Sequence, residues 1–516
     1  MKITRRDALK TSGITLGALG VGGAGKALAQ CTSTAPCYPV DPAETQEYSY
    51  FNKLKTSAPL APYTPLMDNE MRISFMGSTI PLARRAQMEM SVFVEVGPWV
   101  PNPDPRYASN PAYGRATDSF MFDLGTGAST NYAAMGIAFR KMDKLFINHL
   151  HGDHMGDLTQ VYCFGPSGDR KSPMYVWGPS QSGVRSPHPL PGAGGPPARL
   201  YDDGTKAFCQ NLREACRWHT ESFAFQNTAY QSYKDNMPTR ALWGTPCDLD
   251  PVGDDPAYDG FALIPIELDW TKVGGVAYDN RETGVKITHF PVIHCRKGSL
   301  GYKLEWNGLS MIYTSDTKPE WNSVTQASNG GKGVDVFIHE MIVPAEVWAM
   351  KMLGLSQIPN PQSDAFKTYV ASLQNIQNSS HTPQGAFGYL LSQINLRPRL
   401  TVATHFPVSD DTVNCALNSV RAHINDIGVL GQKIVWSFDT MVIRVFAGDP
   451  KPAIVQQVVS PISDFSFSPV SYSPAGLLIP KYHDASGNPN PYAQIDETTE
   501  IKQSENGKAN WCDSGY

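Results

Sequence analysis

The chain has 516 residues, of which 41% are hydrophobic and 18% charged, and its formal net charge is −5 at pH 7. This length exceeds an ordinary single domain and supplies enough apolar side chains for a large core. The negative charge argues against a nucleic-acid partner, because nucleic-acid binding depends on Lys and Arg that neutralise phosphates.

The first thirty residues have the pattern of an export signal. The segment Thr4-Arg-Arg-Asp-Ala-Leu-Lys10 resembles the twin-arginine motif, and a glycine-rich apolar run leads to the small-residue cleavage site Ala27-Leu-Ala29. This run is too short and too rich in glycine for a stable membrane span. We therefore expect residues 1–29 to be a signal peptide and the mature protein to be periplasmic or secreted. A buried N-terminal helix is the alternative.

All nine cysteines follow the expected cleavage site. In an oxidising compartment, their short separations in the sequence make Cys31/Cys37 and Cys209/Cys216 candidates for disulfide bridges. Because nine is an odd number, at least one thiol is free or pairs between chains. The sequence leaves the pairing otherwise open.

The remainder of the chain divides into three parts. Residues 30–68 are rich in Pro, Thr, Ser and Tyr, which predicts an extended arm. A catalytic domain is expected over residues 69–446, with a long irregular insertion at 160–285 that contains a Pro/Gly-dense section. Residues 447–516 are predicted to be a C-terminal extension that wraps the core.

Within residues 69–446, short β-branched and aromatic runs alternate with helical patterns, which predicts an α/β layered fold. The expected strands are 71–78, 91–96, 119–123, 145–147, 285–294, 299–305, 310–317, 333–340, 399–405 and 435–446, and the expected helices are 130–141 and 384–394. Several of these strands end in an ionisable side chain. Layered α/β folds gather their ligand sites at such strand ends.

The segment 144–157 carries the strongest functional signal. A short apolar strand is followed, within six residues, by His149, His151, Asp153 and His154. Alternate residues of an extended segment point to one side, so His149 and His151 can face one metal ion. After the glycine turn, Asp153 and His154 can serve a second. Imidazoles and a carboxylate suit zinc, with Mn²⁺ or another divalent ion as the alternative.

Taken in order, the motifs of the chain resemble those of the metallo-β-lactamase-fold superfamily and, within it, the ribonuclease Z-like hydrolases. The matching segments are Phe75-Met-Gly-Ser78, Phe122-Asp-Leu-Gly-Thr-Gly127, His149-Leu-His-Gly-Asp-His154, His294 with Gly301-Tyr302, Tyr313-Thr-Ser-Asp-Thr317, His339-Glu340, His381 and Thr404-His405. The resemblance covers residues 71–446 without the insertion. It implies an αβ/βα four-layer sandwich, in which two sheets lie face to face with helices outside.

The same resemblance implies a dinuclear centre with two Zn²⁺ ions. The implied ligands are His149, His151 and His294 for the first metal, and Asp153, His154 and His405 for the second. Asp316 would bridge the two ions together with a hydroxide. Asp123 would lie beneath the site and steady the histidine loop.

Proton transfer needs a further residue. His381, oriented by Glu340, is our candidate for protonating the leaving group. His339 is the alternative supporting histidine, and Asp153 is counted among the catalytic residues as well as the ligands. His381 is followed by Thr-Pro where the family has a small hydroxyl pair, so the chain departs from the family pattern at this acid.

These features predict an exported dinuclear zinc-dependent hydrolase that uses a metal-bridging hydroxide on a phosphate or sulfate ester of a small molecule. The sulfate option comes from the resemblance to exported arylsulfatase-like proteins. A tRNA 3′-processing endoribonuclease is the first alternative, against which the export signal and the acidic charge argue. A lactone or β-lactam hydrolase and a metal-binding scaffold without catalysis are further alternatives. The oligomeric state is open, with a dimer implied by the resemblance.

Overall fold

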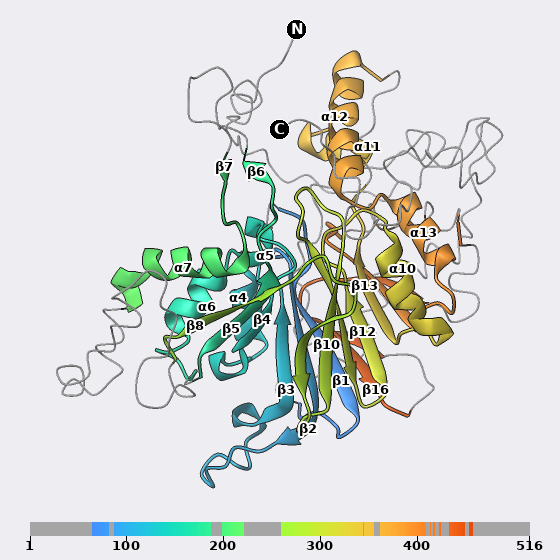
Figure 1. Ribbon diagram of the computed structural model, residues 1–516. Helices are drawn as coiled ribbons and strands as arrows, with labels where there is room; N and C mark the ends of the chain where they lie inside the picture. The colour runs from blue at the N-terminus through green and yellow to red at the C-terminus, as the bar shows by residue number, and fades with distance from the viewer. Residues whose placement is uncertain are drawn as a thin grey trace, which may run out of the picture.

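In a computed structural model, the protein is a sandwich of two mixed β-sheets with helices on the outer sides (Figure 1). The structure describes residues 64–81, 87–170, 172–186, 199–220, 260–343, 345–355, 362–408, 433–448 and 454–457, and a few positions between 413 and 424. The predicted αβ/βα sandwich is confirmed. The expected signal peptide, most of the expected arm and most of the expected C-terminal extension lie outside the described residues.

The first sheet has eight strands in the order β17-β16-β1-β2-β3-β4-β5-β8. Their bounds are β1 (Glu70–Gly77), β2 (Ser91–Val100), β3 (Arg115–Phe122), β4 (Lys144–Phe146), β5 (Met174–Pro179), β8 (Leu263–Leu268), β16 (Met441–Phe446) and β17 (Ile454–Gln457). Strands β3 and β4 run parallel, with Phe122 opposite Phe146. Parallel strands end at the same edge of a sheet. Asp123, which follows β3, and the histidine loop, which follows β4, therefore lie at the same edge of the first sheet.

The second sheet has seven strands in the order β15-β14-β13-β12-β11-β10-β9. Their bounds are β9 (Gly275–Asn280), β10 (Val285–Pro291), β11 (Leu300–Trp306), β12 (Leu309–Tyr313), β13 (Val336–Glu340), β14 (Leu400–Thr404) and β15 (Lys433–Trp436). Strands β12, β13 and β14 are parallel, and β10 points the same way because both of the pairings that join it to β12 through β11 are antiparallel. The residues after these four strands therefore also share one edge.

The helices form two outer layers (Figure 1). Outside the first sheet lie α4 (Ala128–Ala134), α5 (Gly152–Met155), α6 (Leu158–Phe164) and α7 (Thr205–Ala215), and the second sheet carries α10 (Trp321–Ser328), α11 (Ala345–Met352), α12 (Asp364–Ser380) and α13 (Gln384–Gln393). Among the described residues, no helix combines the length and the apolar character that crossing a bilayer requires.

The space between the sheets is filled by aromatic side chains from both. Phe122 and Phe146 of the first sheet pack against Tyr302 and Tyr313 of the second, and all four are fully buried. Phe146 also stacks on Trp177, with ring centroids 4.6 Å apart. Burial of each such ring contributes about 1.5–3 kcal/mol to stability, so this layer holds the two strand edges in register.

Three segments differ from the sequence-based expectation. The predicted helix 130–141 ends at Ala134, because Gly136 adopts a left-handed backbone (φ 69°) that terminates it. The predicted strand 435–446 divides at Thr440 (φ 64°) into β15 and β16, which lie in different sheets. The irregular insertion predicted at 160–285 is wrong for its described parts, because β5 and β8 are parallel strands of the first sheet.

The predicted Cys209/Cys216 bridge is also wrong. Cys209 lies within α7 and Cys216 caps that helix, and both are free thiols. Seven residues along a helix span about 10 Å, whereas a disulfide needs Cα atoms about 4.4–6.8 Å apart. The candidate bridge Cys31/Cys37 lies outside the described residues.

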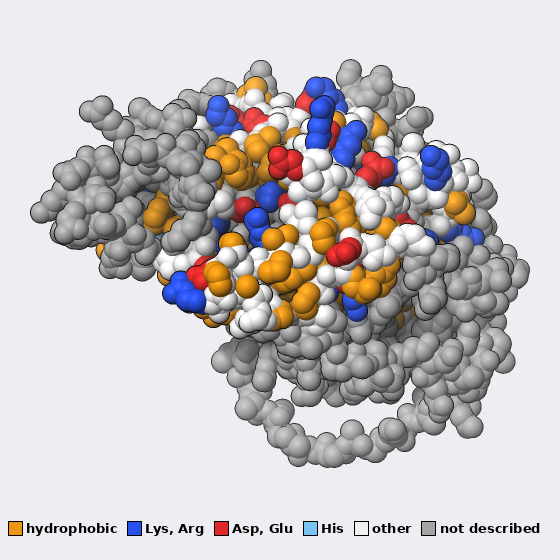
Figure 2. All heavy atoms as spheres, turned by 90° about the horizontal axis from the view of Figure 1, so that it is seen from below, with side chains coloured by type: hydrophobic (Ala, Val, Ile, Leu, Met, Phe, Trp, Pro, Cys, Tyr) orange, Lys and Arg blue, Asp and Glu red, His pale blue; other side chains and the backbone are white. Residues whose placement is uncertain are grey.

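The end of the sandwich seen from below the view of Figure 1 has a mixed surface (Figure 2). On the part of this face that described residues form, Lys and Arg side chains lie among Asp, Glu and hydrophobic side chains. This part of the face therefore lacks the continuous basic surface typical of nucleic-acid binding.

Glu70 on β1 is the centre of a buried ionic cluster and gives a stability prediction. Its Oε1 lies 2.9 Å from Arg72 Nε and 2.8 Å from Arg444 Nε. Burial alone would raise the pKa of this carboxyl, but the hydrogen bonds from Arg444 and the charge of Arg72 lower it below the ordinary 4.5. We expect Glu70→Gln to lower the free energy of unfolding at pH 7 by about 3 kcal/mol, because two guanidinium groups lose their buried partner.

The same substitution should have a characteristic pH dependence. A depressed pKa stabilises the fold above pH 4.5, and this contribution is lost as the pH falls through the lower pKa of the folded state. The difference between wild type and Glu70→Gln in urea unfolding should therefore shrink below pH 4.5. Asp104→Asn, in an exposed pair, is the control and should leave the stability unchanged. If Glu70→Gln lost the same free energy of unfolding at all pH values, Glu70 would not be ionised in the folded protein.

Candidate metal centre

The strand edges of the two sheets meet, and they bring the seven predicted ligands together. The candidate ligand atoms form groups within which they lie no more than 4.8 Å apart. The first group is His149, His151 and His294; the second is Asp153, His154, Asp316 and His405; and a third, His294, Asp316, Glu340 and His381, overlaps both. The first sheet supplies the loop after β4, and the second supplies the residues after β10, β12 and β14.

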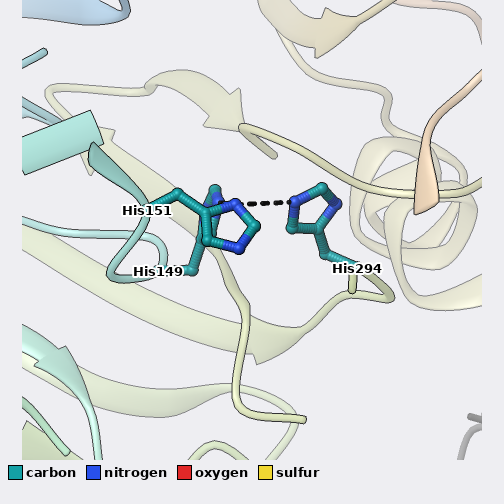
Figure 3. Close-up of side chains that lie close together, drawn as sticks. All are labelled: His149, His151 and His294. Atoms are coloured by element: carbon teal, nitrogen blue, oxygen red, sulfur yellow. Dashed lines mark hydrogen bonds between the residues drawn. The ribbon is translucent and has the colours of Figure 1, made fainter. Parts of the chain in front are cut away.

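The first group consists of three converging imidazoles (Figure 3). His151 Nδ1 lies 2.8 Å from His149 Nε2 and 3.2 Å from His294 Nε2. His149 donates its Nδ1 proton to Asn148 Oδ1 at 2.6 Å, and His294 donates its Nδ1 proton to the carbonyl of Ser380 at 2.7 Å. The Nε2 lone pairs of His149 and His294 therefore both point at Nδ1 of His151. A divalent cation at the point of convergence would satisfy all three.

The second group combines two imidazoles with two carboxylates. His154 Nε2 lies 3.3 Å from Asp153 Oδ2 and 3.4 Å from Asp316 Oδ1. His405 Nε2 lies 3.2 Å from Asp153 Oδ2 and 3.4 Å from Asp316 Oδ2. His154 Nε2 and Asp316 Oδ1 are buried and have no hydrogen-bond partner among the described residues. These orphaned buried atoms fit a second cation.

Asp316 faces both groups. Its Oδ2 is also 3.7 Å from His294 Nε2 of the first group. Burial alone would raise the pKa of this carboxyl, but the charges of His405 and His154 hold it well below the ordinary range. An ionised carboxylate between two sets of imidazoles is the arrangement that a bridging ligand requires.

Burial and charge also set the protonation of the histidines. Burial holds the pKa of His149 and His294 well below the ordinary value, so both imidazoles are neutral, as metal ligands must be. His154 is the opposite case. Burial lowers its pKa, but Asp153, Asp316 and Asp123 together raise it well above the ordinary value. Three carboxylates that hold a proton on His154 would equally attract a metal cation.

Asp123 lies beneath the cluster and accepts hydrogen bonds from both sheets. Its Oδ2 accepts from Tyr313 Oη at 2.7 Å, Ser315 Oγ at 2.7 Å and His154 Nδ1 at 2.8 Å. Its Oδ1 accepts from the backbone N–H of Asn148 at 2.8 Å. Asp123, Ser315 and His405 all adopt left-handed backbone conformations, with φ of 56°, 53° and 55°. Such conformations are unfavourable for non-glycine residues and often mark functional sites.

Asn148 is a site residue that the sequence reasoning missed. Its Nδ2 donates to the carbonyl of Thr314 at 2.8 Å, which leaves Oδ1 to accept the Nδ1 proton of His149. Asn148 thus selects the tautomer that presents His149 Nε2 to the cluster. The available signal was its position directly before His149, but a neutral amide does not stand out in a search for ionisable ligands.

We expect Asn148→Ala to weaken metal binding by about 10–100-fold, as is usual when a residue that orients a ligand is lost. The affinity can be measured by competition with a chromophoric chelator. Asn102→Ala is a matched control, because the Asn102 side chain bonds only to the backbone of its own loop, donating to the carbonyl of Tyr113 and accepting from the N–H of Asp104. Unchanged affinity in Asn148→Ala would show that His149 does not depend on this hydrogen bond.

His381 lies at the edge of the cluster and pairs with Glu340. Its Nδ1 is 3.0 Å from both carboxylate oxygens of Glu340 and 3.8 Å from Asp316 Oδ2. Burial lowers the pKa of His381, but the charge of Glu340 outweighs it and raises this pKa to about 9. Thr382 donates its hydroxyl proton to the carbonyl of Thr317 at 2.7 Å, which ties the segment after His381 to the end of β12. Thr382 therefore has a structural role.

The structure does not bring His339 to the cluster. Its ring lies between Phe337 and Phe387, with centroids 5.3 Å and 5.6 Å away, and its Nδ1 donates to the carbonyl of Glu340 at 2.7 Å. Adjacent strand residues point to opposite faces, so β13 directs Glu340 to the site and His339 into the core under α13.

No family model matches this chain. Similar curated sequences include ribonuclease Z from Treponema denticola, 31% identical over 13% of this chain and 21% of its own length, and ribonuclease BN from Citrobacter koseri, 35% identical over 13% and 21%. Ribonuclease Z from Mycolicibacterium gilvum is 23% identical over 48% of this chain and 70% of its own length. The match thus covers only 21% of the length of the Treponema denticola and Citrobacter koseri relatives.

Similar solved structures include a metallo-β-lactamase-fold protein, a tRNase Z and a diiron β-hydroxylase. The Bacillus subtilis metallo-β-lactamase-fold protein YhfI is 9% identical over 73% of this chain and 100% of its own, with a TM-score of 0.40. The short form of human tRNase Z is 17% identical over 72% and 98%, with a TM-score of 0.34. The diiron β-hydroxylase CmlA from Streptomyces venezuelae is 11% identical over 77% and 55%, with a TM-score of 0.37.

Proposed function

We propose that this protein is a metal-dependent hydrolase that cleaves a phosphate or sulfate ester of a small molecule at a dinuclear centre. The observation that carries the proposal is the position of Asp316 between two groups of ligand atoms, one of three imidazoles and one of imidazoles and carboxylates. The sequence similarity to ribonucleases Z and BN, whose substrates are joined by phosphate esters, supports the phosphate option.

Two divalent cations bound by these groups, zinc or manganese, would lower the pKa of a shared water and polarise the oxygen of the ester. The residues of the chain supply the rest. His149, His151 and His294 would hold the first ion, and Asp153, His154 and His405 the second. Asp123 and Asn148 keep the imidazoles in the orientation that binding needs.

His381 is proposed as the general acid. Its raised pKa keeps it protonated near neutral pH, so that it can give a proton to the leaving oxygen. Glu340 orients the ring through the 3.0 Å contacts to Nδ1, which leave Nε2 as the atom available to the substrate. Backbone N–H groups of Thr317 and Thr382 donate to Glu340 and hold its carboxylate in place.

A tRNA 3′-processing endoribonuclease is the second candidate, and the similarity to ribonuclease Z sequences favours it. The net charge of −5 argues against it, because RNA binding depends on phosphate neutralisation. Export is also part of our proposal, and it rests on the pattern of residues 1–29. Sequencing the N-terminus of protein recovered outside the cytoplasm checks it, with Gln30 expected as the first residue.

A substrate panel on zinc-loaded protein tests the proposal. We expect about two metal ions per chain and chelator-sensitive hydrolysis of an aryl phosphate diester, an aryl phosphate or an aryl sulfate. Faster 3′ trimming of a precursor tRNA at physiological salt would establish the second candidate instead. Preferred hydrolysis of a lactone or a β-lactam, or bound metal with no turnover on any substrate, would overturn the ester assignment.

A further inference from the structure

The ring of His405 is held differently from those of three other predicted ligands. His149, His154 and His294 each place Nδ1 within 2.6–2.8 Å of an oxygen atom that fixes the ring. The Nδ1 of His405 is buried and has no hydrogen-bond partner among the described residues. Its ring stacks with those of His154 and His381, with centroids 5.7 Å and 5.4 Å away. The position of its Nε2 therefore depends on the backbone that carries the ring.

That backbone is left-handed, with a φ of 55° at His405. The conformation is unfavourable for a residue with a Cβ and persists only where its surroundings fix it. Ser78, which directly follows β1, and Gln87 supply the contacts. Phe406 donates its N–H to the carbonyl of Ser78 at 3.1 Å. Gln87 Nε2 donates to the carbonyl of Phe406 at 3.0 Å, and Gln87 Oε1 accepts the N–H of Val408 at 2.8 Å. Three hydrogen bonds thus hold the segment that follows His405.

The two residues that supply these contacts are themselves anchored. Gln87 Nε2 also donates to Ser78 Oγ at 2.9 Å, and Ser78 Oγ donates to Asp439 Oδ1 at 2.8 Å. The other oxygen of Asp439 accepts from the N–H of Met88 at 2.7 Å and from Asn131 Nδ2 at 2.6 Å. Gln87 and Ser78 are fully buried. A hydrogen-bonded network that is shielded from water in this way is rigid.

The end of β1 is shaped to admit Gln87. A Cβ at Gly77 would lie 1.6 Å from the carbonyl oxygen of Glu89, so only glycine lets the two segments come this close. Strands β1 and β3 are both antiparallel to β2, so Ser78 emerges at the edge of the first sheet that carries the histidine loop. The Gly-Ser pair in the first of the matched sequence segments therefore lies where it can act on the metal centre.

We propose that Gln87 and Ser78 are positioning residues for the second metal ion. They hold the backbone of His405 so that its Nε2 faces Asp153 at 3.2 Å and Asp316 at 3.4 Å. The inference rests on the proposed dinuclear hydrolase and deepens it: the first sheet contributes to the second ion through the backbone of a ligand from the second sheet. Both residues act through His405 and are not ligands themselves.

The effect of losing these contacts should be confined to the second ion, because the imidazoles of the first group do not depend on Gln87. Gln87→Ala removes two hydrogen bonds to the segment after His405. We expect it to lower the affinity for the second ion by about 10–100-fold, as is usual when a residue that orients a ligand is lost. Ser78→Ala should cost less, since its backbone carbonyl still accepts from Phe406.

An isosteric variant separates positioning from loss of volume. Gln87→Glu keeps an acceptor for the N–H of Val408 but places an oxygen where Nε2 donates to the carbonyl of Phe406. It should therefore lose affinity for the second ion as Gln87→Ala does, although it leaves no cavity. This variant carries the test if Gln87→Ala folds poorly.

Titration of the metal-free full chain with Co²⁺ measures the two affinities separately. The absorption bands of the two ions are assigned with His151→Ala, which removes a ligand of the first group, and His405→Ala, which removes one of the second. Gln377→Ala is the matched control. Gln377 is also a buried glutamine, and its Nε2 donates to the carbonyl of Val343 at 2.7 Å. The control should lose stability in urea unfolding and keep both affinities.

Two outcomes would overturn the inference alone. The Gln87 variants could bind the second ion as tightly as the wild type, or they could lose affinity for both ions equally, which would indicate general destabilisation. A wild-type protein that binds only one Co²⁺ would overturn the dinuclear centre and this inference with it. Because the readout is metal affinity, a failure to find the substrate of the proposed hydrolase leaves the result unaffected.

Discussion

Replacing Asp316 with alanine is expected to remove both metal ions and to lower turnover by more than about 100-fold. Loss of a residue that merely orients a ligand already costs about 10–100-fold, and Asp316 contacts both groups directly. Its oxygens lie 3.4 Å from His154 and His405 and 3.7 Å from His294. Without this carboxylate, the imidazoles would bring cations together with no anion between them to offset their repulsion.

Metal analysis of freshly purified protein measures this effect alongside kcat. Asp335→Asn is a suitable control, because Asp335 directly precedes β13, at the end of that strand opposite Glu340, and accepts the N–H of Ser310 at 2.8 Å. The control should keep both ions. An Asp316→Ala variant that still holds two ions would show that Asp316 does not bridge them.

The second large effect is expected for His381→Ala, which should retain both ions and lose about 10²–10⁴-fold in kcat. His381 lies beside the ligands rather than among them, with its Nδ1 engaged by Glu340 at 3.0 Å. Removing the ring therefore takes away the proton donor and leaves the two ligand groups intact. A substrate with a highly acidic leaving group, which does not need protonation, should be affected much less.

His339→Gln separates the two candidate histidines. Its ring packs between Phe337 and Phe387 in the core, so the variant should lose stability in urea unfolding and keep its kcat. Full activity in His381→Ala, combined with metal retention, would remove His381 from the mechanism. A large loss of kcat in a folded His339→Gln protein would restore His339 as the alternative supporting histidine of the site.

Much of the site could be predicted because its residues follow strands. His149 to His154 form one dense cluster after β4, and ionisable residues after β10, β12 and β14 share an edge for a topological reason. Assigning His294, Asp316 and His405 to the same centre required a family resemblance, since nothing local links residues so far apart. The separation of His339 from Glu340 follows from strand alternation alone and could have been predicted.

Other features could not be read from the sequence. The acceptors that orient the ligands are a neutral amide, Asn148, and a backbone carbonyl, that of Ser380, and neither has an ionisable or periodic signature. Strand β5 was missed because it is a largely buried parallel strand without alternation that ends in Gly and Pro. Strand β8 was missed because it is interrupted by Pro265. The Cys209/Cys216 prediction failed because short sequence separation does not mean short distance along a helix.

Each of the two proposed metal sites draws on both halves of the sandwich. In the first group the first sheet supplies His149 and His151, and the second sheet supplies His294. A chain whose two sheets have not yet docked therefore offers an incoming ion only a partial set of donors. Because metal affinity then depends on complete docking, the binding free energy becomes folding free energy. Metal uptake would thus act as a checkpoint, with a loaded centre reporting that the two halves of the molecule have assembled.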